Sequence, residues 1–299
     1  MTPRQSTAFA AAAAIAAPAA AMAHGGVPDE PPGWTFDPFV VVPLLASGTL
    51  YLVGTTVLWS RAGTGRGIRP WQVLAYSAGF LALAAALTSP LHWLGERLFT
   101  AHMIEHEIVM AVAAPLLALS RPLGAFLWAL PRQVRRGIGR LGRTTAVRRA
   151  WSAVSRPAVA TVLHGLAIWI WHIPSLFDAT VVDITLHRLQ HASFLATALL
   201  FWWALVRRSH HGAACWHLFV TMIHTGILGA LIALAPRVVY AGQTAGAAIC
   251  GLTPLEDQQL AGLVMWVPAG TIYAGAAIAF MGLWIRKSGQ GRAERHAYA

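Results

Sequence analysis

Seven apolar runs constrain this chain more than any other feature, because each is near the ~20 residues that an α-helix needs to cross a bilayer core. They cover residues 38–59, 71–89, 101–119, 157–177, 186–206, 213–235 and 259–284. Only 11% of the residues are charged, whereas a soluble domain carries about a quarter. Since backbone groups in lipid must pair within their own segment, we expect an all-α, polytopic membrane bundle of seven helices.

The basic residues indicate how the bundle is oriented. The net charge is +11, and 21 of the 22 basic residues are arginines. Connections on one side carry 18 of them, densest in the loop 120–156, and those on the other side carry three, Arg97, Arg188 and Arg237. The positive-inside rule then predicts an outside N-terminus, an inside C-terminus and a cytoplasmic basic loop with an in-plane amphipathic helix. No soluble basic face remains to bind nucleic acid.

The two ends of the chain carry further predictions. Residues 1–23 have the pattern of a cleavable signal peptide, with an apolar run followed by Ala21-Met22-Ala23 at the cleavage position. Residues 24–37 would form a short exterior tail, and residues 286–299 a flexible cytoplasmic tail. We therefore expect a multi-pass protein of a bacterial plasma (inner) membrane, in contact with membrane lipid.

Histidines and acids gather at the predicted outer side, and this is the strongest functional signal. His102 and His106 lie four residues apart in the third run, so they share one helix face. Asp183, His187 and His191 repeat that spacing at the start of the fifth run, which has the same polarity. Ionisable groups inside membrane segments are costly and indicate a functional site. The two stripes predict one polar pocket that opens outward.

Three more elements reach the same side: His172 at the end of the fourth run, and Asp257 and Met265 at the start of the seventh. The predicted metal ligands are His102, His106, His187 and His191, with His172 and Met103 or Met265 as adjustable ligands. Asp183 and Asp257 would orient imidazoles or attract the cation. Imidazole and thioether groups without a CxxC motif favour copper over a structural zinc site.

Four motifs carry a family resemblance: HMIEHEIVMAVAAPLLALSRPL, WHIPSLFDA, HRLQHASFLATALLFWW and PLEDQQLAGLVMW. In order and spacing they resemble the CtaG-type, caa3-associated cytochrome c oxidase assembly factors, over residues 39–284. The resemblance implies a membrane protein that matures a haem–copper oxidase, has oxidase subunits as partners, and delivers copper to a nascent subunit. It places the family's histidine pairs on His102/His106 and His187/His191.

Alternatives to a copper carrier remain at this point. A metal-free membrane scaffold for oxidase assembly is the main one, and a bis-histidine haem b protein is the next, because haem ligation between helices uses the same residue type. A retinal pigment is excluded, since the one lysine, Lys287, lies at the cytoplasmic end. No activated nucleophile is evident, so we do not expect an enzyme.

Overall fold

The computed structural model describes residues 33–297, and within that range it contains helices and connecting segments but no strand. The long apolar helices are α1 (Pro38–Ala62), α2 (Pro70–Thr88), the third span (Phe99–Ser120), α11 (Ile184–Arg208), α12 (His211–Ala233) and α13 (Pro254–Ala297). The third span consists of α4 (Phe99–Glu107), the π-helical turn η1 (Ile108–Ala113) and α5 (Ala114–Ser120). These six are long and apolar enough to cross a membrane, so the chain is a multi-pass membrane protein.

The fourth predicted span is shorter than expected. Helix α9 (Pro157–Trp171) has 15 residues, or ~22 Å, and the next helix, α10 (Pro174–Val182), begins after a break at His172 and Ile173. Pro174 explains the break, because a proline pushes the residue before it into an extended conformation, and Ile173 has a ψ of 122°. Helix α8 (Thr145–Val154) meets α9 at 66°, and counting this bent pair as one span gives seven.

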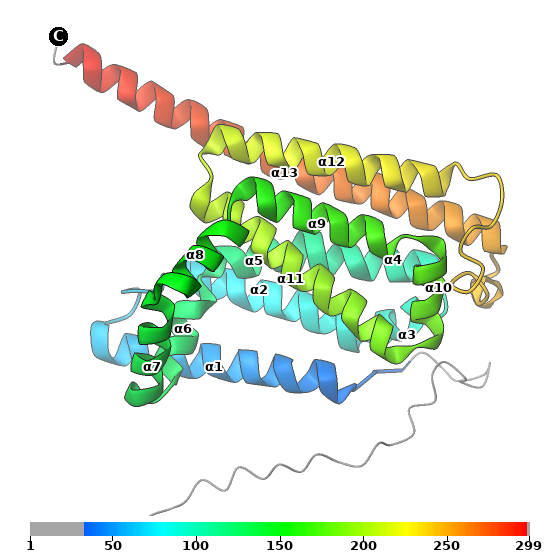
Figure 1. The fold of residues 1–299 in the computed structure, drawn as a ribbon, viewed down its shortest axis with the longest axis horizontal. Coiled ribbons are helices and arrows are strands. Elements are labelled where there is room, and N and C mark those ends of the chain that lie inside the picture. Colours follow the sequence, from blue (N-terminus) through cyan, green and yellow to red (C-terminus); the bar gives the residue numbers. More distant parts are fainter. Residues whose placement is uncertain (1–32, 298–299) are drawn as a thin grey trace, which may run out of the picture.

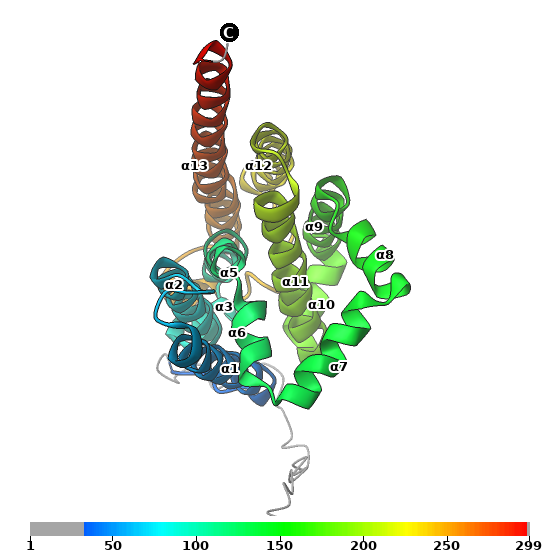
Figure 2. The same cartoon turned by 90° about the vertical axis from the view of Figure 1, so that its left-hand side faces the viewer.

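The long helices lie side by side, and their ends form two chemically distinct regions (Figure 1). We call one the histidine end: α3 (Pro90–Gly95), α10, the segment 234–253, and the first turns of α4, α11 and α13. The opposite region, the arginine end, contains α8, the helices α6 (Pro122–Ala129) and α7 (Arg132–Arg143), and the last turn of α11. Seen from the arginine end, α6, α7 and α8 form an arch that runs from α1 to α9 (Figure 2).

The basic loop expected at residues 120–156 is therefore mostly helical. Helix α6 packs on α1, whereas α7 and α8 have no buried residue. Helix α7 has arginines at near-helical spacing among Val134, Ile138 and Leu141, as an in-plane amphipathic helix does. The tail expected to be flexible instead continues α13 to Ala297. The predicted signal peptide lies outside the described residues, as does most of the exterior tail.

Close helix packing on the far side of the bundle depends on small residues. A Cβ on Gly262 of α13 would come within 2.4 Å of the backbone nitrogen of Ala233, and a Cβ on Gly229 of α12 within 2.8 Å of the nitrogen of Trp266. Without a hydrophobic driving force between helices in lipid, such close backbone contact is a principal source of association. The pair α12 and α13 forms one wall against which α4 and α9 pack.

Candidate metal site

Two helices bring three of the predicted histidines together. His102 and His106 face inward from α4, with ring centroids 4.2 Å apart, and His191 comes from α11, with its ring 4.9 Å from that of His106. One ring nitrogen of each lies within 4.8 Å of the others. Metal–nitrogen bonds of about 2.0–2.1 Å place tetrahedral ligands roughly 3.4 Å apart. Small side-chain rotations would therefore bring these three nitrogens to one ion.

A π-helical turn directly follows these histidines in the third span. Pro115, near the start of α5, has no N–H to donate to the preceding turn, so a regular α-helix cannot pass through this position with all its bonds. The turn η1 widens the helix here instead, and the indole Nε1 of Trp202 donates to the carbonyl of Met110 at 2.9 Å. The polar turns of the span are thereby set apart from its apolar half. Such π-turns occur frequently at functional sites.

The imidazoles are buried with nitrogens that make no hydrogen bond. His102 and His106 are each 1% exposed, and Nε2 of His102 and both nitrogens of His106 and His191 have no hydrogen-bond partner among the described residues. A buried polar atom without a partner costs on the order of 1–3 kcal/mol. Five such nitrogens in one cluster are the expected signature of a site built for a ligand.

Backbone contacts fix the tautomer of His102. Its Nδ1 lies 3.2 Å from the carbonyl oxygen of Gly95, so Nδ1–H donates and the lone pair of Nε2 points into the cluster. The same carbonyl accepts from Nε2 of Gln243 at 2.7 Å. Metal-binding histidines commonly donate their second N–H in this way, which fixes ring orientation and increases basicity.

Glu105 belongs to the interior of the site. It is 0% exposed, and its Oε1 lies 2.8 Å from Nδ1 of His92 and 3.5 Å from Nδ1 of His191. Burial alone would lower the pKa of His92, but the hydrogen bond and the charge of Glu105 outweigh it and raise that pKa. Glu105 thus takes the imidazole-orienting role that the sequence analysis gave to two aspartates.

Those two aspartates cap helices. Asp257 accepts from the backbone nitrogens of Phe99 and Thr100 at 2.8 and 2.9 Å, at the start of the helix that carries His102. Asp183 is exposed and accepts from the backbone nitrogen of Thr185 at 2.7 Å as the N-cap of α11. Both carboxylates therefore position the histidine-bearing helices through backbone N–H groups, and Asp257 also accepts from the hydroxyl of Thr100 at 2.7 Å.

The remaining predicted ligands lie around the three central histidines. The ring of His187 is 4.5 Å from that of His191 and 5.6 Å from that of His102. His172 lies behind two phenylalanines, since the ring of Phe177 contacts both His102 and His172, and the ring of Phe194 contacts both His106 and His172.

The two methionines lie in the hydrophobic core. Met103 and Met265 are each 1% exposed and belong to the main cluster of buried apolar side chains. Their role as thioether ligands stays a prediction.

The cluster is enclosed, whereas the sequence predicted a pocket that opens outward. The segment 234–253 contributes Tyr240, whose hydroxyl donates to the carbonyl of His172 at 2.8 Å. Burial and then the charge of Asp178 raise the pKa of Tyr240 to about 12, so this hydroxyl stays a donor. Oε1 of Gln258 accepts from the backbone nitrogens of Val239 and Tyr240 and holds the segment in place. This cover could not be predicted from the sequence, since its bonds are between the backbone and single polar side chains.

His224 lies on α12, away from the three central histidines. Its Nδ1 accepts from the indole of Trp169 at 3.4 Å, next to α9. His164, also on α9, is 0% exposed and lies 3.2 Å from the hydroxyl of Thr197. These two histidines sit midway along the bundle and form a polar region separate from the candidate metal site.

Comparison with known proteins gives a family and no solved relative. An uncharacterized protein of Mycobacterium bovis is 24% identical over 282 residues, and one of Mycobacterium leprae is 25% identical over the same length. The matches cover 88% of this chain but only 41% of each relative, so the chain spans about two fifths of their length. No solved structure matches the chain significantly. The family model described as cytochrome c oxidase caa3 assembly factor matches residues 49–287, and the chain therefore belongs to that family.

Proposed function

We propose that this protein binds copper as cargo between His102, His106 and His191 and delivers it to a nascent subunit of a haem–copper oxidase. The observation that carries the proposal is the convergence of three imidazoles, each of which offers a nitrogen within 4.8 Å of the other two. Five of their six ring nitrogens are buried without a hydrogen-bond partner among the described residues. Membership of an oxidase assembly family supplies the recipient. Imidazole ligands suit copper, zinc, iron and nickel, and of these copper is the metal that gives a haem–copper oxidase its name.

The arrangement favours a small ion over haem. Five of the six distances between the ring centroids of His102, His106, His187 and His191 are 4.2–5.6 Å. Imidazoles this close to one another leave little room for a porphyrin between two axial histidines. A metal-free scaffold is the second candidate, and the capping of α4 by Asp257 supports it, because this contact would order the histidine end without any ion.

The route for the ion follows from exposure. The side chains of His92 and His191 are each 10% exposed, and Glu96, whose Oε1 lies 3.8 Å from Nε2 of His92, is 21% exposed. An ion would enter past Glu96, meet His92, and then reach the central histidines beside Glu105. Release to a partner would require the cover formed by Tyr240 to move or the same edge to open. The positive-inside orientation predicts that this edge faces the exterior of the cell.

Metal analysis of the purified protein tests the proposal. We expect about one copper or more per chain, lost in His102→Ala/His106→Ala and retained in the matched control His210→Ala/His211→Ala at the arginine end. The double variant should also lower the copper content of the oxidase in the same cells. A Soret band in the visible spectrum would show that the histidines bind haem and not copper. A metal-free parent together with a variant that still supports oxidase assembly would leave the scaffold as the function.

A further inference from the structure

The arginine end contains an apolar groove that opens beside a group of arginines. The groove has a volume of about 860 Å³ and is lined by side chains of α5, α6, α8 and α11. Its apolar lining includes Leu123, Phe126, Ala196, Leu199 and Trp203. These residues belong to or flank the long apolar helices of the bundle.

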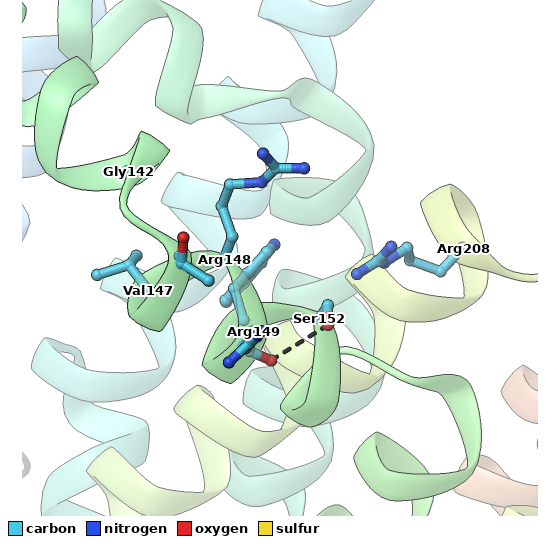
Figure 3. A pocket seen from close by; sticks show the side chains of 8 residues that line it. Gly142, Val147, Arg148, Arg149, Ser152 and Arg208 are labelled. Carbon is cyan, nitrogen blue, oxygen red and sulfur yellow. Dashed lines mark hydrogen bonds between the residues drawn. The ribbon is translucent and has the colours of Figure 1, made fainter.

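Basic side chains border this groove and the hollow next to it. Arg121, Arg207 and Arg208 line the groove. Arg208 also lines a neighbouring hollow of about 630 Å³, together with Arg148 and Arg149 of α8. In Figure 3, Arg208 reaches toward the α8 arginines from the α11 side of the hollow. Trp151 lies between the two spaces and lines both.

These arginines lack an acidic partner among the residues that the structure describes. No ion pair there joins any of the five to an acid, and no acidic side chain lines the groove or the hollow. The arginines instead donate to neutral oxygens: Nη2 of Arg208 to the hydroxyl of Ser155 at 3.0 Å, and Nη2 of Arg207 to the carbonyl of Leu119 at 3.4 Å. Their positive charge is uncompensated within the described chain.

Backbone strain marks the same place. Arg121 joins α5 to α6 in the left-handed conformation, with φ 56° and ψ 51°, and within residues 33–297 no other residue except glycine has a positive φ. This conformation costs an L-residue roughly 1–2 kcal/mol, and such strain concentrates at ligand clamps and functional sites. A glycine would relieve the strain but would remove the guanidinium from the groove.

We propose that this groove and hollow bind one anionic phospholipid, with its phosphate among Arg148, Arg149 and Arg208 and an acyl chain in the groove. The charge of the rim matches a phosphate, which guanidinium groups bind in bidentate fashion. The apolar lining matches the chain. Basic pockets between membrane helices on the cytoplasmic side are the expected form of such lipid sites. The inference is independent of the metal site.

Titration of phosphatidylglycerol into the full-length protein in a nonionic detergent, followed by native mass spectrometry, tests the headgroup contacts. Arg148→Gln/Arg149→Gln should weaken binding about thirtyfold, because each basic residue contributes on the order of 1 kcal/mol to anionic lipid binding and 1.4 kcal/mol is tenfold. The control Arg136→Gln/Arg140→Gln removes the same charge from the exposed face of α7. Equal losses in the two variants would overturn the proposal in favour of general electrostatic attraction.

A second variant tests the acyl chain. Ala196 is exposed in the groove, and Ala196→Trp would fill it without changing any charge. We expect this variant to bind phosphatidylglycerol at least tenfold more weakly and to keep the melting temperature of the parent. Phosphatidylcholine should bind weakly to all forms, and inorganic phosphate should not displace the lipid. Unchanged binding in Ala196→Trp, or displacement by phosphate, would show a phosphate site without a lipid and overturn the proposal.

Discussion

The two ends of the bundle treat charge in opposite ways. At the histidine end, ionisable side chains are buried and enclosed, and Glu105 is 0% exposed between two imidazoles. At the arginine end, α7 and α8 bury no residue and their arginines stay at the surface. Burial makes a polar group dependent on one particular partner, whereas an exposed charge acts through its sum with its neighbours. Single substitutions should therefore have large effects at the histidine end and small ones at the arginine end.

The largest effect in this comparison is expected for Glu105→Gln. Glu105 is hydrogen-bonded to His92 and lies 3.5 Å from Nδ1 of His191. The neutral amide removes the negative charge beside both rings, and loss of such an orienting carboxylate typically lowers metal affinity about 10–100-fold. Glu107→Gln is the matched control, since Glu107 is a buried acid two residues away whose Oε2 makes no hydrogen bond within the described residues. Copper titration against a competing chelator measures both. Equal losses would mean that any negative charge in the span suffices.

The second substitution introduces bulk into the cover. A Cβ on Gly246 would lie 2.3 Å from the carbonyl oxygen of Arg97, so Gly246→Ala should force the segment 234–253 away from the histidine end and cost about 1–3 kcal/mol, as overpacking does. Gly137→Ala on α7 meets nothing within 4 Å and should stabilise its helix by about 0.5–1 kcal/mol. Melting temperatures in detergent compare the two. A stable Gly246→Ala variant would show that the cover is not held closely.

The third substitution removes one hydrogen bond from the cover. Tyr240→Phe loses the bond to the carbonyl of His172, worth about 1 kcal/mol, so copper should leave to a chelator roughly fivefold faster. The control Tyr51→Phe loses a bond to the carbonyl of Gln72, far from the site, and should leave the release rate unchanged. Stopped-flow measurement of release separates them. If Tyr240→Phe releases copper at the parent rate, the ion leaves through the edge at His92.

The smallest effect is expected at a partly exposed salt bridge of the histidine end. Arg188 donates from Nε and Nη2 to the two carboxylate oxygens of Asp37 at 2.7 and 3.1 Å, which ties α11 to the start of α1. Both side chains are partly exposed, 30% and 20%, so solvent screening limits the pair to about 0.5 kcal/mol. Arg188→Lys loses the two-bond geometry, and Arg140→Lys on α7 should change nothing. A drop of several degrees in the melting temperature of Arg188→Lys would show that partial burial strengthens this pair.

The apolar runs, the basic side and the histidine stripes could be predicted from the sequence, because each depends on periodicity or charge along the chain. His102, His106 and His191 converge as the shared polarity of the third and fifth runs implied. The roles of Glu105 and Asp257 could not be predicted. Glu105 contacts an imidazole and Asp257 contacts the backbone nitrogens at the start of α4. Which of these contacts a carboxylate makes depends on how the helices pack against one another.

The enclosure of the site was also beyond the sequence, and for a related reason. The segment 234–253 has no helical period, so its position depends on single bonds such as those of Gln258 and Gln243. The predicted fourth span is longer than α9 because the apolar run continues to residue 177. The helix itself ends at Trp171, and Pro174 begins a new one. Hydropathy indicates whether a segment is apolar enough to cross a membrane. Where its helix ends depends on backbone features such as a proline.

The π-helical turn η1 gives the third span an angular offset. A residue added to one turn of a helix rotates everything on one side of it by about 100° relative to the other side. The histidines of α4 and the apolar surface of α5 can thus face different neighbouring helices although they belong to one continuous helical span. Deleting a single residue from η1 would remove this offset and turn His102 and His106 away from His191, although every ligand would still be present. The site therefore requires the right rotation of α4 about the helix axis as well as the right ligands.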